Sequence, residues 1–198
     1  MISLPADLIE IILDDKLINK HLETIFNEKP IASYKDWIRS LIPEIKKDYS
    51  QSISIRAGNL LHEAIKKWAE NKFGICSNEL FQINGECDDL LLDINNIIMY
   101  FELKLNTQFD SEKSPAVKEK IERRRNLFKE LNKDYYAYVV SLIFSNKEEI
   151  KHKLGKLNKE TIIGYVEFFN LLGFAVKKED WEQLNKLLYN KFTDKIKQ

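Results

Sequence analysis

The sequence predicts an α/β fold in which helices flank a central mixed β-sheet, with a helical region at the N-terminus. Three observations lead to this prediction. Apolar residues recur with helical spacing in both terminal parts of the chain. Two β-like segments joined by Asn95-Asn96 are typical of a hairpin. The segment Tyr135–Phe144 is apolar almost without a break, which indicates a strand that is covered on both faces.

Residues 1–50 have helical character. Pro5 suits the first turn of a helix, because proline at that position gives up no intrahelical hydrogen bond. With an interruption at Pro43, we expect helices over about Pro5–Leu17, Lys20–Asn27 and Ser33–Lys47. A stronger pattern covers Ser54–Asn71, whose apolar stripe comprises Leu60, Leu61, Ala64, Ile65 and Trp68.

The pattern changes to β-structure after Gly74. Leu80–Ile83 suits a short strand, and the Asn84-Gly85 pair that follows it is a turn dipeptide. Cys87–Ile94 is the first strand candidate of the hairpin. Ile97–Leu105 is the second, and it is rich in β-forming residues.

The rest of the chain alternates between helix and strand. Helical spacing over Ser114–Asn132 leads to the buried strand Tyr135–Phe144. Further helices are expected over Glu160–Leu172 and Glu179–Lys195, with one more short strand between them at Gly173–Val176.

The composition is that of a globular domain and argues against several other classes. Of the 198 residues, 44% are hydrophobic and 31% are charged, which is too apolar for a disordered chain. The longest apolar run without a charge, Tyr135–Asn146, falls short of the roughly 18 residues that a membrane helix requires. We expect no secretory signal, and the two cysteines suit a reducing, cytoplasmic environment.

Charged residues gather at one end of the expected hairpin. Asp88 and Asp89 open its first strand, and Glu102-Leu103-Lys104 closes its second. Because side chains at i and i+2 project from the same face of a strand, Glu102 and Lys104 are expected to point together. The hairpin would thus bring two carboxylates and one ammonium into a small volume.

This combination of groups suits metal-assisted hydrolysis of a phosphodiester. Two adjacent carboxylates repel each other, and a hard divalent cation such as Mg²⁺ relieves the repulsion by binding oxygens of both. A lysine beside the metal is able to orient or deprotonate a water molecule. The metal meanwhile stabilises the charge that develops on the phosphate.

The Glu-x-Lys triplet by itself is a weak signal, because it occurs four times. Those that begin at Glu44, Glu70 and Glu149 lie in helical or loop-like surroundings, where the pair is typical of a solvated face. Only the triplet at Glu102 ends a β-like segment that follows another β-like segment opened by acids. The alternative interpretation of this pair is an ion pair on an edge strand.

The stretch Gly85–Asn106 resembles the PD-(D/E)xK nuclease superfamily, in which an aspartate on one strand and Glu-x-Lys on the next form the site. Asp89 lies thirteen residues before Glu102, a spacing common in that superfamily. The proline of the motif is absent, with Asp88 in its place, so the choice between the two aspartates stays open. Asp89 is favoured because an apolar run, Leu90-Leu91-Leu92, follows it directly.

The resemblance implies a role for each site residue. Asp89 and Glu102 would ligate Mg²⁺, with the Leu103 carbonyl as a third ligand and Asp88 as the alternative to Asp89. Lys104 would activate or position the water. Glu63, on the helix before the hairpin, would act as a further catalytic carboxylate. It would either contact a ligand of the first metal or bind a second metal itself.

The resemblance also implies a restriction-endonuclease-like fold, although its motifs cover mainly residues 55–145. We treat residues 1–198 as a single nuclease domain. Its catalytic core would span residues 51–145, between a helical N-terminal region over 1–50 and a helical C-terminal region over 146–198.

The net charge of zero hides two segments of opposite sign. Residues 61–104 carry eight acids and four bases, whereas residues 113–133 carry eight bases and three acids. Basic side chains there would neutralise phosphates, and arginine also pairs with guanine edges. The candidates for DNA contacts are Asn106, Lys113, Lys120, Arg123, Arg124 and Arg125.

The alternative interpretation of the basic segment is a helix face that is merely solvated. Arg124 argues against it, because this residue falls on the apolar stripe of its helix. An arginine there is either ion-paired inside the protein or reaching a phosphate.

Size and the ending of the hairpin most resemble a type II restriction endonuclease, which would cut double-stranded DNA at a short specific site. That class implies a homodimer and a partner DNA methyltransferase that protects the host sites. One alternative is a structure-selective repair nuclease or junction resolvase of the same superfamily. Another is a non-catalytic nucleic-acid-binding module, in which Asp89, Glu102 and Lys104 form a structural ion pair.

Overall fold

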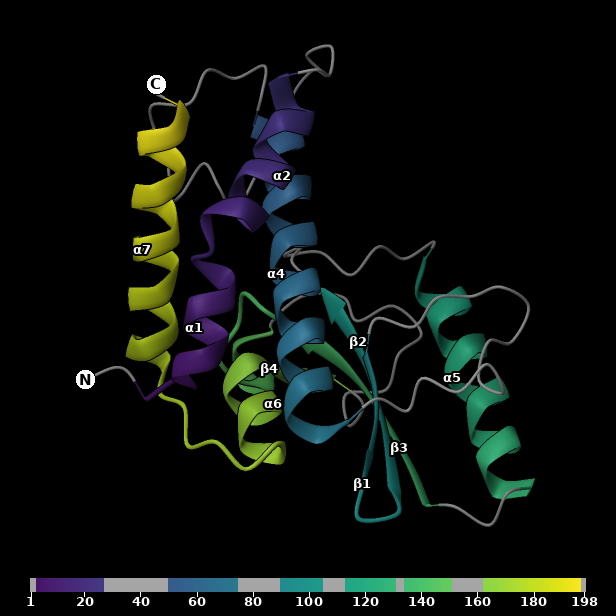
Figure 1. The fold of residues 1–198 in the computed structure, drawn as a ribbon. Helices are drawn as coiled ribbons and strands as arrows, with labels where there is room; N and C mark the ends of the chain where they lie inside the picture. Colours follow the sequence, from purple (N-terminus) through teal and green to yellow (C-terminus); the bar gives the residue numbers. More distant parts are fainter. Residues whose placement is uncertain are drawn as a thin grey trace. The chain divides into compact units, whose positions relative to one another are not determined.

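The computed structural model describes residues 3–26, 50–74, 90–104, 113–130, 134–150 and 162–196 (Figure 1). The chain divides into two compact units. One combines residues 1–68 with residues 169–198, and the other comprises residues 69–168. The first unit is built from helices, and the second contains the β-sheet.

The helices of the first unit are α1 (Ala6–Ile12), α2 (Asp15–Phe26), most of α4 (Ser50–Phe73) and α7 (Lys178–Ile196). The helices predicted over Ser54–Asn71 and Glu179–Lys195 are therefore confirmed, each slightly longer than expected. The helix expected over Ser33–Lys47 lies outside the described residues.

The single helix expected to run to Leu17 is wrong, because the chain breaks after Ile12. The carboxylate of Asp14 accepts a hydrogen bond of 2.8 Å from the Leu17 N–H, which is the N-cap arrangement of a new helix. The Lys191 ammonium on α7 donates to the Leu13 carbonyl at 2.6 Å and satisfies an oxygen that the break leaves free of the helix.

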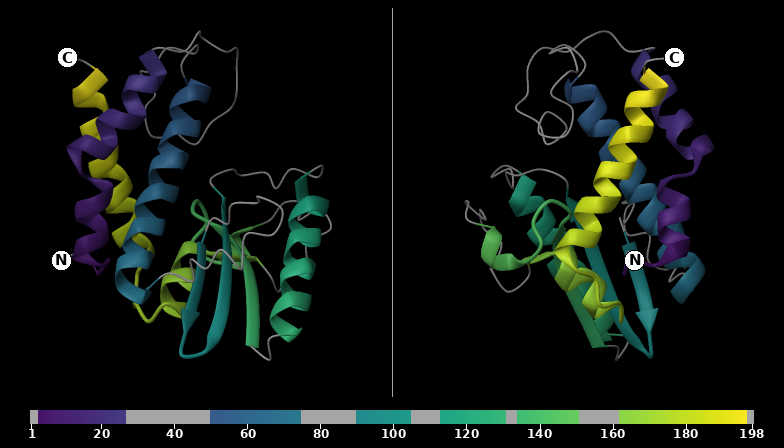
Figure 2. Two further views of the ribbon diagram at one scale, coloured as in Figure 1. Left: turned by 45° about the vertical axis from the view of Figure 1, so that its right-hand side comes forward. Right: turned by 90° about the vertical axis from the view of Figure 1, so that its left-hand side faces the viewer.

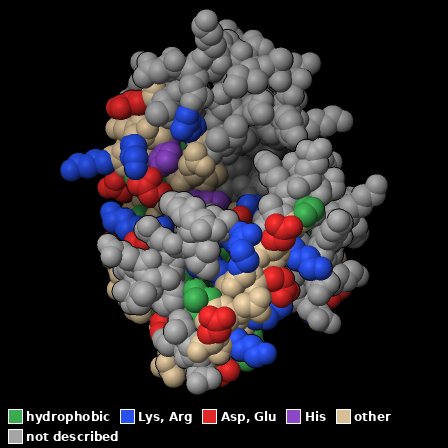
Figure 3. Space-filling model, turned by 90° about the vertical axis from the view of Figure 1, so that its right-hand side faces the viewer, with side chains coloured by type: hydrophobic (Ala, Val, Ile, Leu, Met, Phe, Trp, Pro, Cys, Tyr) green, Lys and Arg blue, Asp and Glu red, His purple; other side chains and the backbone are tan. Residues whose placement is uncertain are grey.

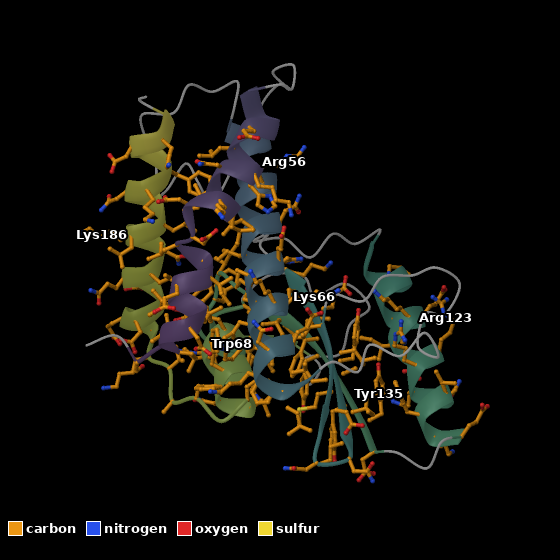
Figure 4. All side chains as sticks on the ribbon, in the orientation of Figure 1. Arg56, Lys66, Trp68, Arg123, Tyr135 and Lys186 are labelled. Atoms are coloured by element: carbon orange, nitrogen blue, oxygen red, sulfur yellow. The ribbon has the colours of Figure 1, made fainter. Side chains whose placement is uncertain are left out.

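Large aromatic side chains form the core of the first unit. Trp68, labelled in Figure 4, lies 5.9 Å from Phe169 and 5.2 Å from Phe174 between ring centroids. Phe169 in turn lies 5.7 Å from Trp181 on α7. Since aromatic side chains bury the most apolar surface per residue, these contacts hold the start of α7 against the end of α4.

The first turn of α7 yields a prediction about stability. Asp180 accepts a hydrogen bond from Ser3 Oγ and one of 3.1 Å from the Lys177 N–H, and these bonds hold the pKa of its carboxyl below the usual value. We expect Asp180→Ala to lower the free energy of unfolding by about 1 kcal/mol at neutral pH.

The difference in the free energy of unfolding between wild type and Asp180→Ala should depend on pH. A depressed pKa contributes stability above the ordinary pKa of the group, and that stability is lost as the pH falls through the folded-state value. Urea titrations of wild type and Asp180→Ala should therefore converge in acid. A difference that stays constant from pH 7 to pH 3 would contradict the assignment.

The second unit contains a four-stranded mixed sheet in the order β1-β2-β3-β4. β1 (Leu90–Ile94) pairs with β2 (Ile97–Lys104) in antiparallel orientation. β3 (Asp134–Ser141) pairs with β2 in parallel, and β4 (Ile162–Gly164) pairs with β3 in parallel. The predicted mixed sheet is confirmed, and β2 lies inside the sheet order rather than at an edge.

The predicted hairpin is confirmed at Asn95-Asn96. Both residues have positive φ, 53° and 70°, as the type I′ turn of a two-residue hairpin requires. The turn sets the register, in which Ile94 pairs with Ile97 and Leu90 pairs with Phe101. The predicted strand Leu80–Ile83 and the turn at Asn84-Gly85 lie outside the described residues.

Helices cover both faces of the sheet, as predicted. On one face, Ile121 and Phe128 of α5 (Lys113–Glu130) pack with Tyr100 and Val139, and Figure 2 shows α5 running along that face. On the other face, Phe101 makes an edge-on contact of 5.0 Å with Phe168 of α6 (Tyr165–Leu171). Adjacent strand residues point to opposite faces, so Tyr100 and Phe101 mark the two sides.

The helix expected over Glu160–Leu172 is wrong at its start, because Ile162–Gly164 forms β4. The two β-branched residues pair in parallel with Val139 and Val140 of β3, and this pairing overrides the helical spacing. α6 begins only at Tyr165, and its Glu167 carboxylate accepts hydrogen bonds from the Gly164 N–H at 2.8 Å and the Lys147 N–H at 2.9 Å.

The short strand expected at Gly173–Val176 is also wrong. Gly173 has φ of +86° and ends α6, with the Phe174 N–H donating to the Phe169 carbonyl at 2.9 Å. This arrangement is a glycine helix cap, which needs the left-handed conformation that glycine adopts most readily.

None of the helices in the described ranges is long and apolar enough to cross a bilayer.

Candidate active site

The carboxyl end of β2 carries the Glu-x-Lys pair singled out in the sequence. Lys104 Nζ lies 2.6 Å from Glu102 Oε1, so the two side chains point together, as expected. Both project from the face of β2 that also carries Tyr100, which packs under α5. The pair therefore lies on the α5 side of a strand that is internal in the described sheet, and not on an edge strand.

Two further groups contact the second oxygen of Glu102. The Tyr100 hydroxyl donates a hydrogen bond to Oε2. The Lys120 ammonium, which comes from α5, lies 3.4 Å from the same oxygen and 5.3 Å from the centre of the Tyr100 ring. Side chains from β2 and α5 thus surround one carboxylate, and we call Tyr100, Glu102, Lys104 and Lys120 the Glu102 cluster.

The Glu102 cluster is largely withdrawn from solvent, since the exposed fractions of the Glu102 and Lys120 side chains are 10% and 15%. Burial raises the pKa of Glu102, but the Lys104 ammonium, the Tyr100 hydroxyl and the Lys120 ammonium together outweigh it. The pKa of Glu102 therefore lies below its usual value, and the carboxylate is ionised at neutral pH. An ionised oxygen pair is the ligand type that Mg²⁺ prefers.

β3, the strand next to β2, ends at the same end of the sheet as β2. Lys104 pairs in register with Ser141, and the Leu142 N–H donates to the Lys104 carbonyl at 2.9 Å. Because carbonyls alternate in direction along a strand, that of Leu103 points to the β1 side. The Leu103 side chain itself is buried on the opposite face from Glu102.

Three predicted site residues lie outside the described ranges, namely Asp88, Asp89 and Asn106. Among the described residues, no group of three or more histidine, cysteine, aspartate or glutamate side chains is placed to hold a metal. Glu102 is the one described carboxylate of the Glu102 cluster.

Glu63 lies on α4, as predicted, in the helical unit. Its carboxylate accepts from the Lys20 ammonium at 2.7 Å and lies 3.0 Å from His21 Nε2, while its side chain is 40% exposed. These bonds, with that of Lys20 the strongest, hold the pKa of Glu63 below its usual value. Its catalytic role stays a prediction.

The basic residues of α5 occupy three different environments. Arg124 is only 1% exposed and lies inside the protein, one helical turn after Lys120. Arg123 and Arg125 face solvent, and Arg125 pairs with Glu122 at 2.7 Å. Lys113 begins α5, and its side chain is not among those described.

The figures show the outer side of α5 directly. In Figure 4, Arg123 projects outward from α5, whereas Tyr135 lies between β3 and the helix. Figure 3 views the structure from the side on which α5 lies, and its coloured basic and acidic side chains are interspersed. Of the three consecutive arginines, Arg123 and Arg125 therefore lie at the surface of α5, whereas Arg124 is buried.

Sequence reasoning missed two contributions to the Glu102 cluster. Tyr100 precedes Glu102 by two residues, so strand alternation was a sufficient signal for it. Lys120 precedes Arg124 by one helical turn, so helical spacing already puts it next to the buried stripe of its helix, but the sequence analysis considered it only as a DNA contact.

No family model, curated protein or solved structure matches this chain.

Proposed function

We propose that the protein is a Mg²⁺-dependent endonuclease that hydrolyses phosphodiester bonds in double-stranded DNA at a short specific sequence, as type II restriction enzymes do. The observation that carries the proposal is the ionised, largely buried Glu102 held by Lys104 at the carboxyl end of an internal strand. This arrangement supports the resemblance to PD-(D/E)xK nucleases drawn from the sequence.

Each group has a task in this proposal. Glu102 would supply a metal ligand, and the Lys104 ammonium would orient the attacking water and stabilise the negative charge that develops on its oxygen. Tyr100 fixes the rotamer of Glu102 through its hydrogen bond. Bound Mg²⁺ supplies Lewis-acid stabilisation of the charge on the phosphate.

The second carboxylate is proposed from strand alternation, because Asp88 and Asp89 lie outside the described residues. Leu91 pairs with Tyr100, and both belong to the apolar cluster under α5. Counting back two residues from Leu91 gives position 89, just as counting forward two from Tyr100 gives Glu102. Asp89, rather than Asp88, is therefore proposed to complete the metal site.

The two aspartates provide a matched pair of variants. We expect Asp89→Asn to lower Mg²⁺-dependent cleavage by at least about 100-fold, because even outer-shell partners of a metal cost up to that factor. Asp88→Asn removes the same charge one residue away and should cleave within about threefold of wild type. Cleavage rates at saturating Mg²⁺ measure both. A larger loss of cleavage in Asp88→Asn than in Asp89→Asn would reject the assignment of Asp89.

DNA binding is proposed to involve the outward side chains Arg123 and Arg125, with Lys113 and Asn106 as further candidates. Cutting both strands of a palindromic site implies a homodimer, with one Glu102 cluster for each strand. A restriction enzyme further implies a DNA methyltransferase as its partner in the host.

Digestion of sequence-diverse linear DNA tests the proposed function. Purified protein with Mg²⁺ should give discrete fragments, and mapping their ends gives the recognition sequence and stagger. The same reaction in EDTA should leave the DNA intact. Cleavage only at branched substrates would indicate the structure-selective nuclease instead. The absence of cleavage with both Mg²⁺ and Mn²⁺ would reject a metal-dependent nuclease.

One observation favours a second candidate, the non-catalytic binding module. Both oxygens of Glu102 already have partners, as a structural ion pair requires. In that case Glu102→Gln should leave Mg²⁺ and Mn²⁺ binding unchanged in calorimetry, because neither metal binds to the wild type. Metal binding that is lost in Glu102→Gln would favour the nuclease.

A further inference from the structure

We propose that Lys120 is an internal counter-ion of Glu102, which it releases when Mg²⁺ binds, and that the freed ammonium then contacts the phosphate of the DNA. This inference rests on the proposed nuclease function and adds a positioning residue on α5 to it. Lys120 would couple the binding of metal to the binding of DNA.

The geometry distinguishes the two lysines of the Glu102 cluster. Lys104 lies 2.6 Å from Oε1, which is a close charge-assisted hydrogen bond. Lys120 lies 3.4 Å from Oε2, an oxygen that already accepts from the Tyr100 hydroxyl. The longer contact on the shared oxygen is the weaker of the two, so Lys120 is the group that a cation replaces more readily.

Charge gives the reason for the replacement. The single carboxylate of Glu102 faces two ammoniums in a region where solvent screens little. A divalent cation on the same carboxylate would repel both, and the repulsion grows as the distances shorten. The repulsion is relieved when one ammonium leaves.

The two lysines also reach Glu102 from different elements. Lys120 comes from α5, whereas Lys104 shares the strand β2 with Glu102. The face of the Tyr100 ring lies 5.3 Å from the Lys120 ammonium and offers it a second favourable contact besides Glu102. A released Lys120 adds one positive charge beside the carboxyl end of β2, where the proposed function places the phosphate.

The inference predicts opposite effects on two binding equilibria. Lys120→Met removes the competing ammonium, so Mg²⁺ should bind about fivefold more tightly in calorimetry without DNA. The same variant should bind DNA about tenfold more weakly in Ca²⁺, with a salt dependence reduced by about one phosphate contact. Because binding linkage is reciprocal, Mg²⁺ should also strengthen DNA binding less in the variant than in wild type.

Lys118→Met is the matched control, since it removes the same charge from an exposed position of α5 two residues away. It should leave Mg²⁺ affinity within about twofold of wild type. Lys120→Gln serves as a second variant, and urea unfolding without metal confirms that each variant is folded. If the role of Lys120 is purely structural, its replacement should weaken the binding of both Mg²⁺ and DNA.

The outcomes separate this inference from the proposed function. Wild-type protein that binds neither Mg²⁺ nor Mn²⁺ overturns the proposed function and the inference with it. Wild-type protein that binds Mg²⁺ and cuts DNA, with unchanged or weaker Mg²⁺ affinity in the folded Lys120 variants, overturns the inference alone. Tighter metal binding with weaker DNA binding supports it.

Discussion

Replacing Lys104 by alanine is expected to lower the rate of Mg²⁺-dependent DNA cleavage by about 10²–10³-fold, the range that one positioned donor to developing charge contributes. The Lys104 ammonium lies 2.6 Å from Glu102 Oε1, so the variant loses both the group that orients water and a counter-ion of the carboxylate. Cleavage of a plasmid that carries the mapped site, measured under single-turnover conditions, gives the rate.

Lys72→Ala is a fitting control, because Lys72 ends another Glu-x-Lys triplet, Glu70-Asn71-Lys72, on the helix α4. It should cleave at the wild-type rate. Undiminished cleavage by Lys104→Ala would remove the catalytic role of the triplet on β2. Equal losses in the two variants would show that the assay responds to net charge rather than to the site.

Replacing Gly164 by alanine is expected to lower the free energy of unfolding by roughly 3 kcal/mol. A Cβ atom at this position would lie 2.3 Å from the Asn146 backbone nitrogen and 2.4 Å from the Ser145 carbonyl oxygen, so the two backbone segments would have to separate. Their separation is resisted by hydrogen bonds of 3.0 Å from the Tyr165 and Val166 N–H groups to the carbonyls of Phe144 and Ser145. Urea titration at neutral pH measures the loss.

Gly173→Ala separates this steric effect from the ordinary cost of replacing glycine. Gly173 has φ of +86° and nothing within 4 Å of an added Cβ, so its variant should lose only about 1 kcal/mol, from backbone strain. If the two variants are equally stable, the close approach at Gly164 does not limit the packing of β4.

The hairpin and the Glu-x-Lys pair were predictable because their signals are local. Asn95-Asn96 favours the left-handed turn, and alternation fixes the face that Glu102 shares with Lys104. Tyr100 could have been added by the same rule. Lys120 could not be assigned to Glu102, because that contact depends on how α5 packs against β2.

The errors have physical causes of the same kind. Ile162 and Ile163 fit a helical spacing, but pairing with β3 gives them a strand conformation that local propensity did not reveal. Asp14 caps a new helix inside a segment that reads as continuous. The contact of Glu63 with Lys20 and His21 joins residues more than forty positions apart, and no sequence signal marks it.

The two-residue turn at Asn95-Asn96 also determines the phase of β1 relative to β2. β2 is held in place by its pairing with β3, so a change in turn length moves β1 alone. Inserting one residue would exchange the two faces of β1 and turn Leu91 away from α5. The buried face of β1 therefore depends on the length of this turn as much as on the sequence of the strand.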